Sequence, residues 1–452
     1  MHLVGAGGAG MSAIGAVLRS LGHRVTGSDL KDSHSVATLM ALGAEVNIGH
    51  DAANIESSVD VVARSTAIPD HNAEIIAANK ASIPVASRAA ILTAITKLKS
   101  SIAVAGTHGK TTTSSMLALL LRHADRMPSF IIGGEVNEIG SGAVWESGEH
   151  LVVEADESDG TFLVLDAQVA IVTSVEPDHL DLYGDAATVR LAFEEFLAGV
   201  DGPRVVCIDD PDGAAVAATC ETTTYGTSAE ARYRITDFTQ DRSSSTFTIA
   251  WDDDGQGREQ RIELSAPGLH NARNATAAFV CALELGVSAD VAAAGLARYA
   301  GVARRFDFRG EAGGITFVDD YAHLPSEVEV TLDAAAGGEW ERIVAVFQPH
   351  RFTRTAALGA DFGPAFAGAD IVAVTDIYSA GEAAIPGVSG KLVADAIAAT
   401  TPDVGVVWLP HRVDLVDWLR NELRTGDLCL TLGAGDLTSL PDQMIALLGG
   451  RA

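Results

Sequence analysis

The sequence has few cysteines, and none of them are paired at a functional spacing. Its four cysteines, Cys207, Cys220, Cys281 and Cys429, are scattered through 452 residues. The absence of a CxxC pair excludes zinc-finger and dithiol redox motifs. The absence of a GxSxG motif likewise leaves no serine nucleophile elbow. We expect reduced, mostly buried cysteines, as in a cytoplasmic protein.

Positive charge is also scarce. The chain has 31 Lys and Arg against 60 Asp and Glu, which gives a net charge of −29 and a pI near 4.7. This balance argues against nucleic acid or an anionic membrane as a partner, because both require a cationic surface. No apolar run reaches 18 residues, so no membrane insertion is predicted.

The N-terminus shows no signal peptide, since a strand and a glycine turn follow Met1 at once. This supports a cytoplasmic location. The first strand covers only residues 2–4, which is consistent with a few residues missing upstream.

Strands and helices alternate through the first 96 residues, which predicts a parallel sheet covered by helices. The expected strands are residues 2–4, 24–27, 44–48, 59–63 and 84–85, and the expected helices are 11–21, 35–42 and 72–79. Gly5, Gly7 and Gly10 form a GxGxxG turn between the first strand and the first helix. Asp29 follows Gly10 by 19 residues, the position of an acid that binds a ribose hydroxyl. A Rossmann-like nucleotide site is predicted here; alternatively, the glycines only make the turn.

Residues 105–113, AGTHGKTTT, are the strongest indication of phosphate binding. A buried strand, residues 102–105, precedes them and a helix, residues 114–122, follows. In such a loop the backbone N–H groups and the helix N-terminus face the phosphates, Lys110 supplies a charge and Thr111 a hydroxyl for Mg²⁺. The loop is shorter than the standard Walker pattern, because only two residues separate Gly106 from Gly109.

Acidic clusters follow the next two strands of this unit. Glu154 and residues 156–159 come after strand 151–154, and residues 176–181 come after strand 169–172. Because the carboxyl ends of parallel strands meet at one edge, these acids predict an Mg²⁺ site.

The rest of the chain predicts a β-meander over residues 230–264 and a third α/β unit after a junction at residues 304–307. Polar clusters follow four strands of this last unit, which indicates a working edge. The fold class is therefore α/β with three domains. Residues 1–96 are Rossmann-like, residues 97–306 form a P-loop ATPase-type domain carrying the small β-meander, and residues 307–452 are a second Rossmann-like domain. Two phosphate loops and no nucleophile motif favour phosphoryl transfer from ATP to an acceptor.

Eight motifs in order resemble those of the Mur ligases of bacterial cell-wall synthesis, over nearly the whole chain. They are GAGGAGMS at 5–12, AGTHGKTTT at 105–113, EADESD at 154–159, EPDHLD at 176–181, GLHNARN at 268–274, RRFD at 304–307, DDYAH at 319–323 and QPHRFTRT at 348–355.

The resemblance implies an ATP-dependent amide ligase. ATP and Mg²⁺ would activate the carboxylate of UDP-N-acetylmuramate as an acyl phosphate, and the amine of L-alanine would attack it through a tetrahedral intermediate. The first domain would then bind the UDP-sugar instead of NAD, and the C-terminal domain would close over ATP and the amino acid.

The resemblance also assigns residues. The expected catalytic residues are Lys110, His179, His323 and Arg351. ATP would contact Gly106, Thr107, Gly109, Lys110, Thr111, Thr112, Asn271, Asn274, Arg305 and Asp320. The substrates would contact Gly7, Gly8, Gly10, Asp29, Ser65, Thr66, His350 and Arg354. The metal ligands would be Thr111, Glu154 and, for a second ion, His179.

Two positions depart from the family pattern. Leu324 stands where a second histidine is usual, so His323 is the expected functional histidine. Phe193 stands where several sister ligases carry a carbamylated lysine, so no carbamate is expected to bridge the metals.

Three alternatives remain open on the sequence alone. A related ligase adds a whole tripeptide to the same UDP-sugar, and the amino-acid pocket cannot be read from the sequence. A nicotinamide-dependent oxidoreductase would use Gly5, Gly10 and Asp29 but leaves the Lys110 loop unexplained. A non-catalytic nucleotide switch leaves the polar edge of the third domain unexplained.

Overall fold

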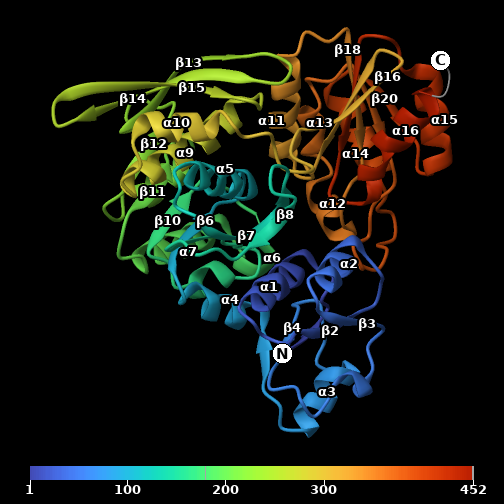
Figure 1. Ribbon diagram of the computed structural model, residues 1–452. Helices are drawn as coiled ribbons and strands as arrows, with labels where there is room; N and C mark the ends of the chain where they lie inside the picture. The colour runs from blue at the N-terminus through green and yellow to red at the C-terminus, as the bar shows by residue number, and fades with distance from the viewer. Residues whose placement is uncertain (179, 450–452) are drawn as a thin grey trace. The chain divides into compact units, whose positions relative to one another are not determined.

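Three β-sheets, each accompanied by helices, organise the chain (Figure 1). The computed structural model describes residues 1–178 and 180–449. The sheets contain five, ten and six strands, and their order along the chain matches the three α/β units expected from the sequence. The domain boundaries at residues 96 and 306 stay predictions.

The first sheet is wholly parallel, with strand order β3-β2-β1-β4-β5. Leu3 and Val4 of the central strand are fully buried. Neighbouring strands lie on both sides of β1, so the order reverses there and a ligand crevice is expected beyond its carboxyl end. The elements are β1 (His2–Val4), α1 (Ala9–Ser20), β2 (Thr26–Asp29), α2 (His34–Ala41), β3 (Glu45–Ile48), η1 (Ala52–Asn54), β4 (Val62–Arg64), α3 (Ala73–Lys80), β5 (Val85–Ser87) and α4 (Arg88–Thr96).

The second sheet has ten strands in the order β15-β14-β13-β12-β11-β10-β6-β9-β7-β8. Its central strand β6 pairs in parallel with β9 on one side and β10 on the other. Its first elements are β6 (Ser100–Ala105), α5 (Lys110–His123), β7 (Ser129–Val136), β8 (Ser141–Val144), β9 (His150–Glu154), η2 (Thr161–Val164), β10 (Val169–Val172), α6 (Leu180–Tyr183) and α7 (Ala186–Ala198). Helix α5 begins at Lys110, four residues before the predicted start, because the glycine loop leads directly into its first turn.

The predicted β-meander forms the other end of this sheet. The remaining elements of this part of the chain are β11 (Arg204–Cys207), α8 (Pro211–Ala217), β12 (Thr223–Gly226), β13 (Tyr233–Gln240), β14 (Ser245–Asp253), β15 (Gln256–Leu264), α9 (Leu269–Glu284) and α10 (Ala289–Leu296). Strands β13, β14 and β15 correspond to the meander. In the turn between β13 and β14, Arg242 donates hydrogen bonds to the carbonyls of Gly338 and Glu339 at 2.5 and 2.9 Å. Its guanidinium also stacks on Trp340, 4.3 Å from the ring centre. These contacts anchor the turn to the segment that follows α11 (Pro325–Ala336).

The third sheet has strand order β16-β17-β21-β18-β19-β20, with only β16 antiparallel to its neighbour. Its remaining elements are β16 (Asp307–Ala312), β17 (Ile315–Asp320), β18 (Arg342–Phe347), α12 (Phe352–Leu358), α13 (Phe362–Ala365), β19 (Ile371–Val374), α14 (Lys391–Thr400), β20 (Gly405–Trp408), α15 (Arg412–Glu422), β21 (Asp427–Leu432), η3 (Asp436–Ser439) and α16 (Leu440–Gly449). The inner strands are buried on both faces, which explains their continuous apolar sequences.

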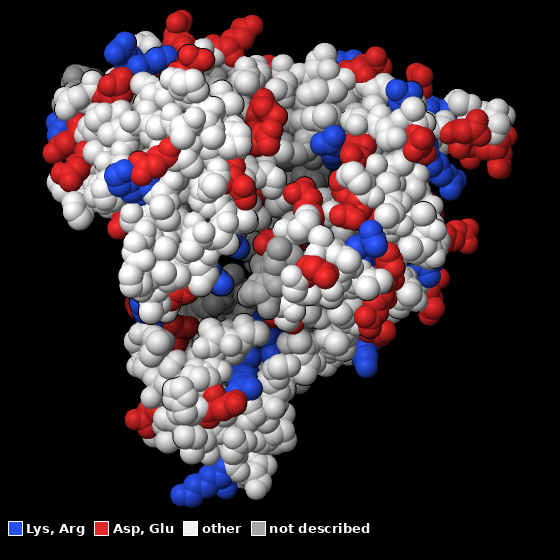
Figure 2. All heavy atoms as spheres, turned by 180° about the vertical axis from the view of Figure 1, so that it is seen from behind, with Lys and Arg blue, Asp and Glu red and all other residues white. Residues whose placement is uncertain are grey.

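The chain divides into two compact units, and each is assembled from separate segments. One unit contains residues 1–237, 247–263 and 273–299, and the other contains residues 238–246, 264–272 and 300–452. Within the described ranges, no helix is both long and apolar enough to cross a membrane. On the face shown in Figure 2, acidic and basic side chains of the described residues are interspersed.

Candidate functional site

The first glycine turn lies at the carboxyl end of β1, next to the end of β2. The N–H of Gly7 donates a hydrogen bond of 2.8 Å to Asp29, so the acid expected to bind a ribose here holds the turn itself. A Cβ at Gly7 would lie 2.9 Å from Val36 and 3.0 Å from Asp29, which only glycine avoids. Ser65 and Thr66 follow β4, and Ser65 lies beside Gly5. Gly7, Gly8, Gly10, Asp29 and Ser65 thus share one sheet edge.

Arg88 is a basic residue at this edge that the sequence interpretation missed. It is the first residue of α4, directly after β5. One guanidinium nitrogen lies 2.8 Å from the point where a Cβ of Gly10 would stand, and another donates to Asp159 at 2.9 Å. A cation beside a glycine turn suits a pyrophosphate. Its position after a strand end could have identified it.

The second glycine loop connects β6 to α5, and two glycines are sterically required in it. Gly106 has φ +133°, and a Cβ there would lie 2.0 Å from the Thr173 hydroxyl. Gly109 has φ +81°, and a Cβ there would lie 2.3 Å from the side-chain oxygen of Asn274. Gly109 is the N-cap of α5, so Lys110, Thr111 and Thr112 form the first turn. The loop and the free N–H groups of this turn can bind an anion.

Lys110 is held by the loop and by a carboxylate. Its ammonium group donates to the Gly106 carbonyl at 2.6 Å, to the Thr107 carbonyl at 3.2 Å and to Glu157 at 2.8 Å. Burial disfavours the charge of Lys110, but Glu157 and the nearby Asp156 and Glu154 outweigh it and raise the pKa of Lys110. The lysine is therefore a fixed cation. Glu157 was not singled out from the sequence.

Thr111 and Glu154 form a hydroxyl–carboxylate pair beside this lysine. The Thr111 hydroxyl donates to Glu154 at 3.1 Å, and the N–H of Gly133 donates to the other carboxylate oxygen at 2.7 Å. These two oxygen donors fit Mg²⁺, which keeps several waters and takes phosphate oxygens as further ligands. The described residues contain no cluster of three or more His, Cys, Asp or Glu that could hold a metal ion. His179, the predicted ligand of a second ion, lies outside the described residues.

The two predicted asparagines lie in the first turns of α9, which starts at Leu269. The side-chain oxygen of Asn274 lies 2.3 Å from the point where a Cβ of Gly109 would stand, so Asn274 adjoins the loop. Asn271 is buried, and its amide donates to the Pro267 carbonyl at 2.7 Å. Phe193, at the position of the lysine in sister ligases, is fully buried against Phe162, with ring centres 5.2 Å apart.

In the third sheet, Asp320 ends β17 and faces the preceding linker. Its carboxylate accepts hydrogen bonds from the N–H groups of Phe306 at 2.7 Å and Ala322 at 2.8 Å. Burial raises the pKa of Asp320 to about 6, although the charge of Arg305 opposes the rise. Arg305 lies 5.1 Å from the ring centre of Tyr321. The Thr331 hydroxyl also donates to this carboxylate, at 3.3 Å, so three donors hold Asp320 at the end of the strand.

A row of aromatic rings joins the carboxyl ends of β17, β18 and β19. The ring centres of His323 and His350 are 5.7 Å apart, and His350 stacks on Tyr378 at 5.7 Å with an interplanar angle of 11°. Burial lowers the pKa of His323. Burial, and then the charges of His323, Arg354 and Arg351, lower the pKa of His350 to about 4. His350 is therefore neutral at pH 7 and can donate or accept a hydrogen bond there.

Arg351 has φ +69°, an unfavourable conformation for a residue with a side chain. A hydrogen bond stabilises it, because the Arg351 N–H donates to the Tyr378 carbonyl at 2.8 Å, next to the parallel bridge between His350 and Tyr378. Arg354, one turn along α12, contacts His350 at 3.4 Å. The structure therefore brings the predicted His323, His350 and Arg354 together and adds Tyr378, which the sequence interpretation did not select. Its place in the polar segment that follows β19 was a signal that could have identified it.

Comparisons with known proteins match nearly the whole chain. The model described as "Mur ligase family, catalytic domain" matches residues 1–100, "Mur ligase middle domain" matches 104–282, and "Mur ligase, glutamate ligase domain" matches 304–435. The UDP-N-acetylmuramate–L-alanine ligase of Anaeromyxobacter sp. (strain Fw109-5) is 44% identical over 99% of this chain and 97% of its own length.

Solved structures agree. A UDP-N-acetylmuramate-alanine ligase from Thermotoga maritima matches with a TM-score of 0.86 and 28% identity, covering 100% of this chain and 99% of the other. A murein peptide ligase from Psychrobacter arcticus matches with a TM-score of 0.73 and 22% identity, covering 100% and 99%. The second likeness shows a shared fold.

Proposed function

Since the chain belongs to the Mur ligase family, a family of ATP-dependent ligases, we propose that it joins L-alanine to the carboxylate of UDP-N-acetylmuramate. ATP is converted to ADP and phosphate in the reaction. The observation that carries the choice of substrates is the 44% identity to an L-alanine-adding ligase over 99% of the chain. The eight sequence motifs and this similarity lead to the same pair of substrates.

The reaction proceeds in two stages. A carboxylate oxygen of the muramic acid group attacks the γ-phosphorus of ATP, ADP leaves, and an acyl phosphate forms. The amine of L-alanine then attacks the acyl carbon, giving a tetrahedral intermediate that loses a proton from nitrogen and expels phosphate. Each stage develops negative charge on phosphate oxygens, so fixed cations and N–H donors are the main requirement.

The Lys110 loop is suited to the first stage. The backbone N–H groups of the α5 N-terminus would hold the β- and γ-phosphates, and Lys110 would exchange its Glu157 contact for phosphate oxygens. Thr111 and Glu154 would hold Mg²⁺, and His179 a second ion. When bound, Mg²⁺ neutralises charge on the phosphates and draws electron density from the transferring group.

The other edges supply the remaining groups. The turn of Gly7, Gly8 and Gly10 would bind the pyrophosphate of the UDP-sugar, with Arg88 beside it. Asn271 and Asn274 would contact the adenine side of ATP, and Asp320 its ribose. Arg305, His323, His350, Arg351 and Arg354 would contact phosphates and the amino acid. The positions of the Gly7 turn after β1 and of Asp320 at the end of β17 support these proposals.

A coupled assay tests the proposal. Phosphate release from MgATP is measured with UDP-N-acetylmuramate and either L-alanine, glycine, L-serine or a tripeptide beginning with L-alanine, and the product is identified by mass spectrometry. We expect release that requires both UDP-N-acetylmuramate and L-alanine. Preference for the tripeptide would identify a peptide-adding ligase, and release without any amine would contradict amide ligation.

A further inference from the structure

Two neighbouring pairs of charged residues, Arg304-Arg305 and Asp319-Asp320, face each other where the linker enters the third sheet. β16 and β17 pair here, with Asp307 opposite Asp319. Successive side chains of a strand point to opposite faces. Asp320 therefore faces the α11 side, where Thr331 contacts it, whereas Asp319 faces Thr438 in η3. The proposed ATP-binding residues, Arg305 and Asp320, thus each have a neighbour with no assigned role.

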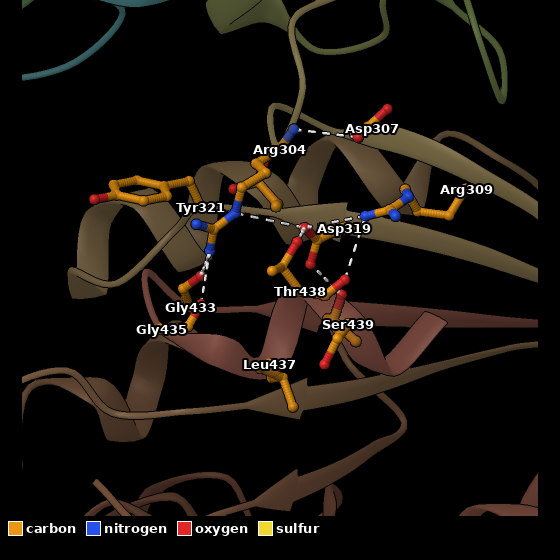
Figure 3. Close-up of polar contacts among 12 residues, drawn as sticks. Arg304, Asp307, Arg309, Asp319, Tyr321, Gly433, Gly435, Leu437, Thr438 and Ser439 are labelled. Carbon is orange, nitrogen blue, oxygen red and sulfur yellow. Dashed lines mark hydrogen bonds and ion pairs between the residues drawn. The ribbon is translucent and has the colours of Figure 1, made fainter. Parts of the chain in front are cut away.

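Asp319 is a buried anion at the centre of this cluster (Figure 3). It accepts hydrogen bonds of 2.5 Å from the hydroxyls of Thr431 and Thr438. Its carboxylate lies 3.7 Å from Arg304 and 3.9 Å from Arg309. Two cations therefore balance a carboxylate that is 1% exposed.

Arg304 makes contacts that Arg309 does not. One terminal nitrogen donates to the carbonyls of Gly433 at 2.7 Å and Gly435 at 3.3 Å. Its guanidinium stacks on Tyr321, 4.8 Å from the ring centre. Its backbone is fixed as well, because its N–H donates to Asp307 at 3.2 Å and its carbonyl accepts from the Tyr321 N–H at 2.9 Å. This backbone adopts φ +65°.

The loop held by Arg304 packs in turn on the segment that leads to His350. A Cβ at Gly433 would lie 2.9 Å from the Gln348 carbonyl, and a Cβ at Gly435 would lie 2.2 Å from the Gln348 side-chain oxygen. Gln348 also donates to Asp436 at 2.8 Å. Arg304 therefore connects the linker, the end of β17 and the loop after β21.

We propose that Arg304 is a positioning residue for nucleotide binding. Together with Asp319 it fixes the linker to the loop at residues 433–435, so that Arg305 and Asp320 are held ready for ATP. The inference rests on the proposed roles of Arg305 and Asp320. A lysine cannot replace Arg304, because an ammonium group has no plane to stack on Tyr321 and no second nitrogen to face Asp319 while the first donates to the two carbonyls.

The test compares Arg304→Lys, which keeps the charge, with Arg309→Met, which removes the second cation of Asp319 but leaves the linker contacts. Steady-state kinetics give kcat and the KM values for ATP and UDP-N-acetylmuramate, and calorimetry gives the Kd of ADP without the other substrates. For Arg304→Lys we expect the ADP Kd and the ATP KM to rise roughly 10- to 100-fold, the effect of removing a group that orients ligand-binding residues. The KM for UDP-N-acetylmuramate should change less than about twofold. Arg309→Met should lower the Tm with ADP affinity unchanged.

Two results would overturn the inference. One is an Arg304→Lys variant that loses Tm but keeps wild-type ADP affinity, which is the behaviour of a purely structural residue. The other is an equal loss of ADP affinity in Arg309→Met, which would assign the effect to charge balance on Asp319. ADP binding by the wild-type chain is measured independently of ligation, so failure of the proposed L-alanine ligation would be recognised separately.

Discussion

The ammonium group of Lys110 lies 2.8 Å from Glu157, and the two side chains are only 13% and 4% exposed. Burial raises the pKa of Glu157, while the charge of Lys110 opposes the rise. A carboxylate so placed occupies the lysine until phosphate oxygens replace it, and it depends on that lysine to stay ionised.

We first predict that Lys110→Ala reduces turnover by about 1,000-fold, because a fixed cation at the transferring phosphoryl group is lost. The variant should still fold, but with a lower Tm, since Glu157 is left without its buried partner. The double variant Lys110→Ala/Glu157→Gln should recover Tm but not activity. Circular dichroism melting and the phosphate-release assay measure the two effects. Full activity in Lys110→Ala would contradict the role given to the loop.

The second prediction concerns Glu154, whose carboxylate accepts from the Thr111 hydroxyl at 3.1 Å. Glu154→Gln keeps the volume but removes the charge, so the Mg²⁺ concentration for half-maximal activity should rise by about tenfold or more. Glu146→Gln is a matched control, because Glu146 pairs with Arg122 and not with the glycine loop. A Mg²⁺ titration at fixed ATP compares them; identical titration curves for the two variants would count against a metal site at Glu154.

Third, we expect the Tyr378 ring, which stacks on His350, to contribute to catalysis. Tyr378→Ala removes the ring and leaves the backbone bridge to His350 and the hydrogen bond from Arg351. We therefore expect kcat/KM for L-alanine to fall by about tenfold, a cost of ~1.4 kcal/mol. Tyr378→Phe keeps the ring and should retain most of the activity. If Phe and Ala lose activity equally, the hydroxyl and not the stack is responsible.

The fourth prediction concerns the cost of a buried charge. The pKa of Asp320 is raised from 3.8 to about 6 by burial, so its ionisation destabilises the folded chain. The folded state binds the proton more tightly than the unfolded state, and stability therefore falls as pH rises from about 4 to about 6. Asp320→Asn should remove this penalty and raise the free energy of unfolding at pH 8 by up to about 3 kcal/mol.

The same variant should bind ATP weakly, so stability and function change in opposite directions. Denaturant titrations between pH 5 and 8 check the sign: the gain should shrink as pH falls. A gain that is constant with pH would show that the carboxylate charge is not its cause. Asp319→Asn offers a contrast, because Asp319 has two arginines beside it and its loss should destabilise the chain.

The contiguous parts of the site could be predicted from the sequence. The Lys110 loop lies within one strand–turn–helix segment, and the spacing of its glycines, lysine and threonine is enough to predict a phosphate-binding loop. The predicted helices at 11–21 and 35–42 lie within two residues of Ala9–Ser20 and His34–Ala41. Regular apolar periodicity explains this agreement.

Contacts between distant segments could not be predicted. Glu157 contacts Lys110 across 47 residues, and Tyr378 contacts His350 through a bridge between two loops. The β7–β8 hairpin was also missed, because its glycine-rich sequence around residues 133–142 has a weak strand pattern. Arg304 was assigned only to a domain junction, since its contacts with residues 433 and 435 depend on tertiary packing.

The anchoring of Arg242 beside Trp340 has a consequence for biosynthesis. Residues 238–246 belong to the same compact unit as residues 300–452, although residues 247–263 and 273–299 complete the other unit. During translation, this turn is therefore synthesised well before the residues on which it packs, and it cannot form these contacts until the C-terminal sheet has been translated. A fragment beginning at residue 300 would also lack part of its own unit.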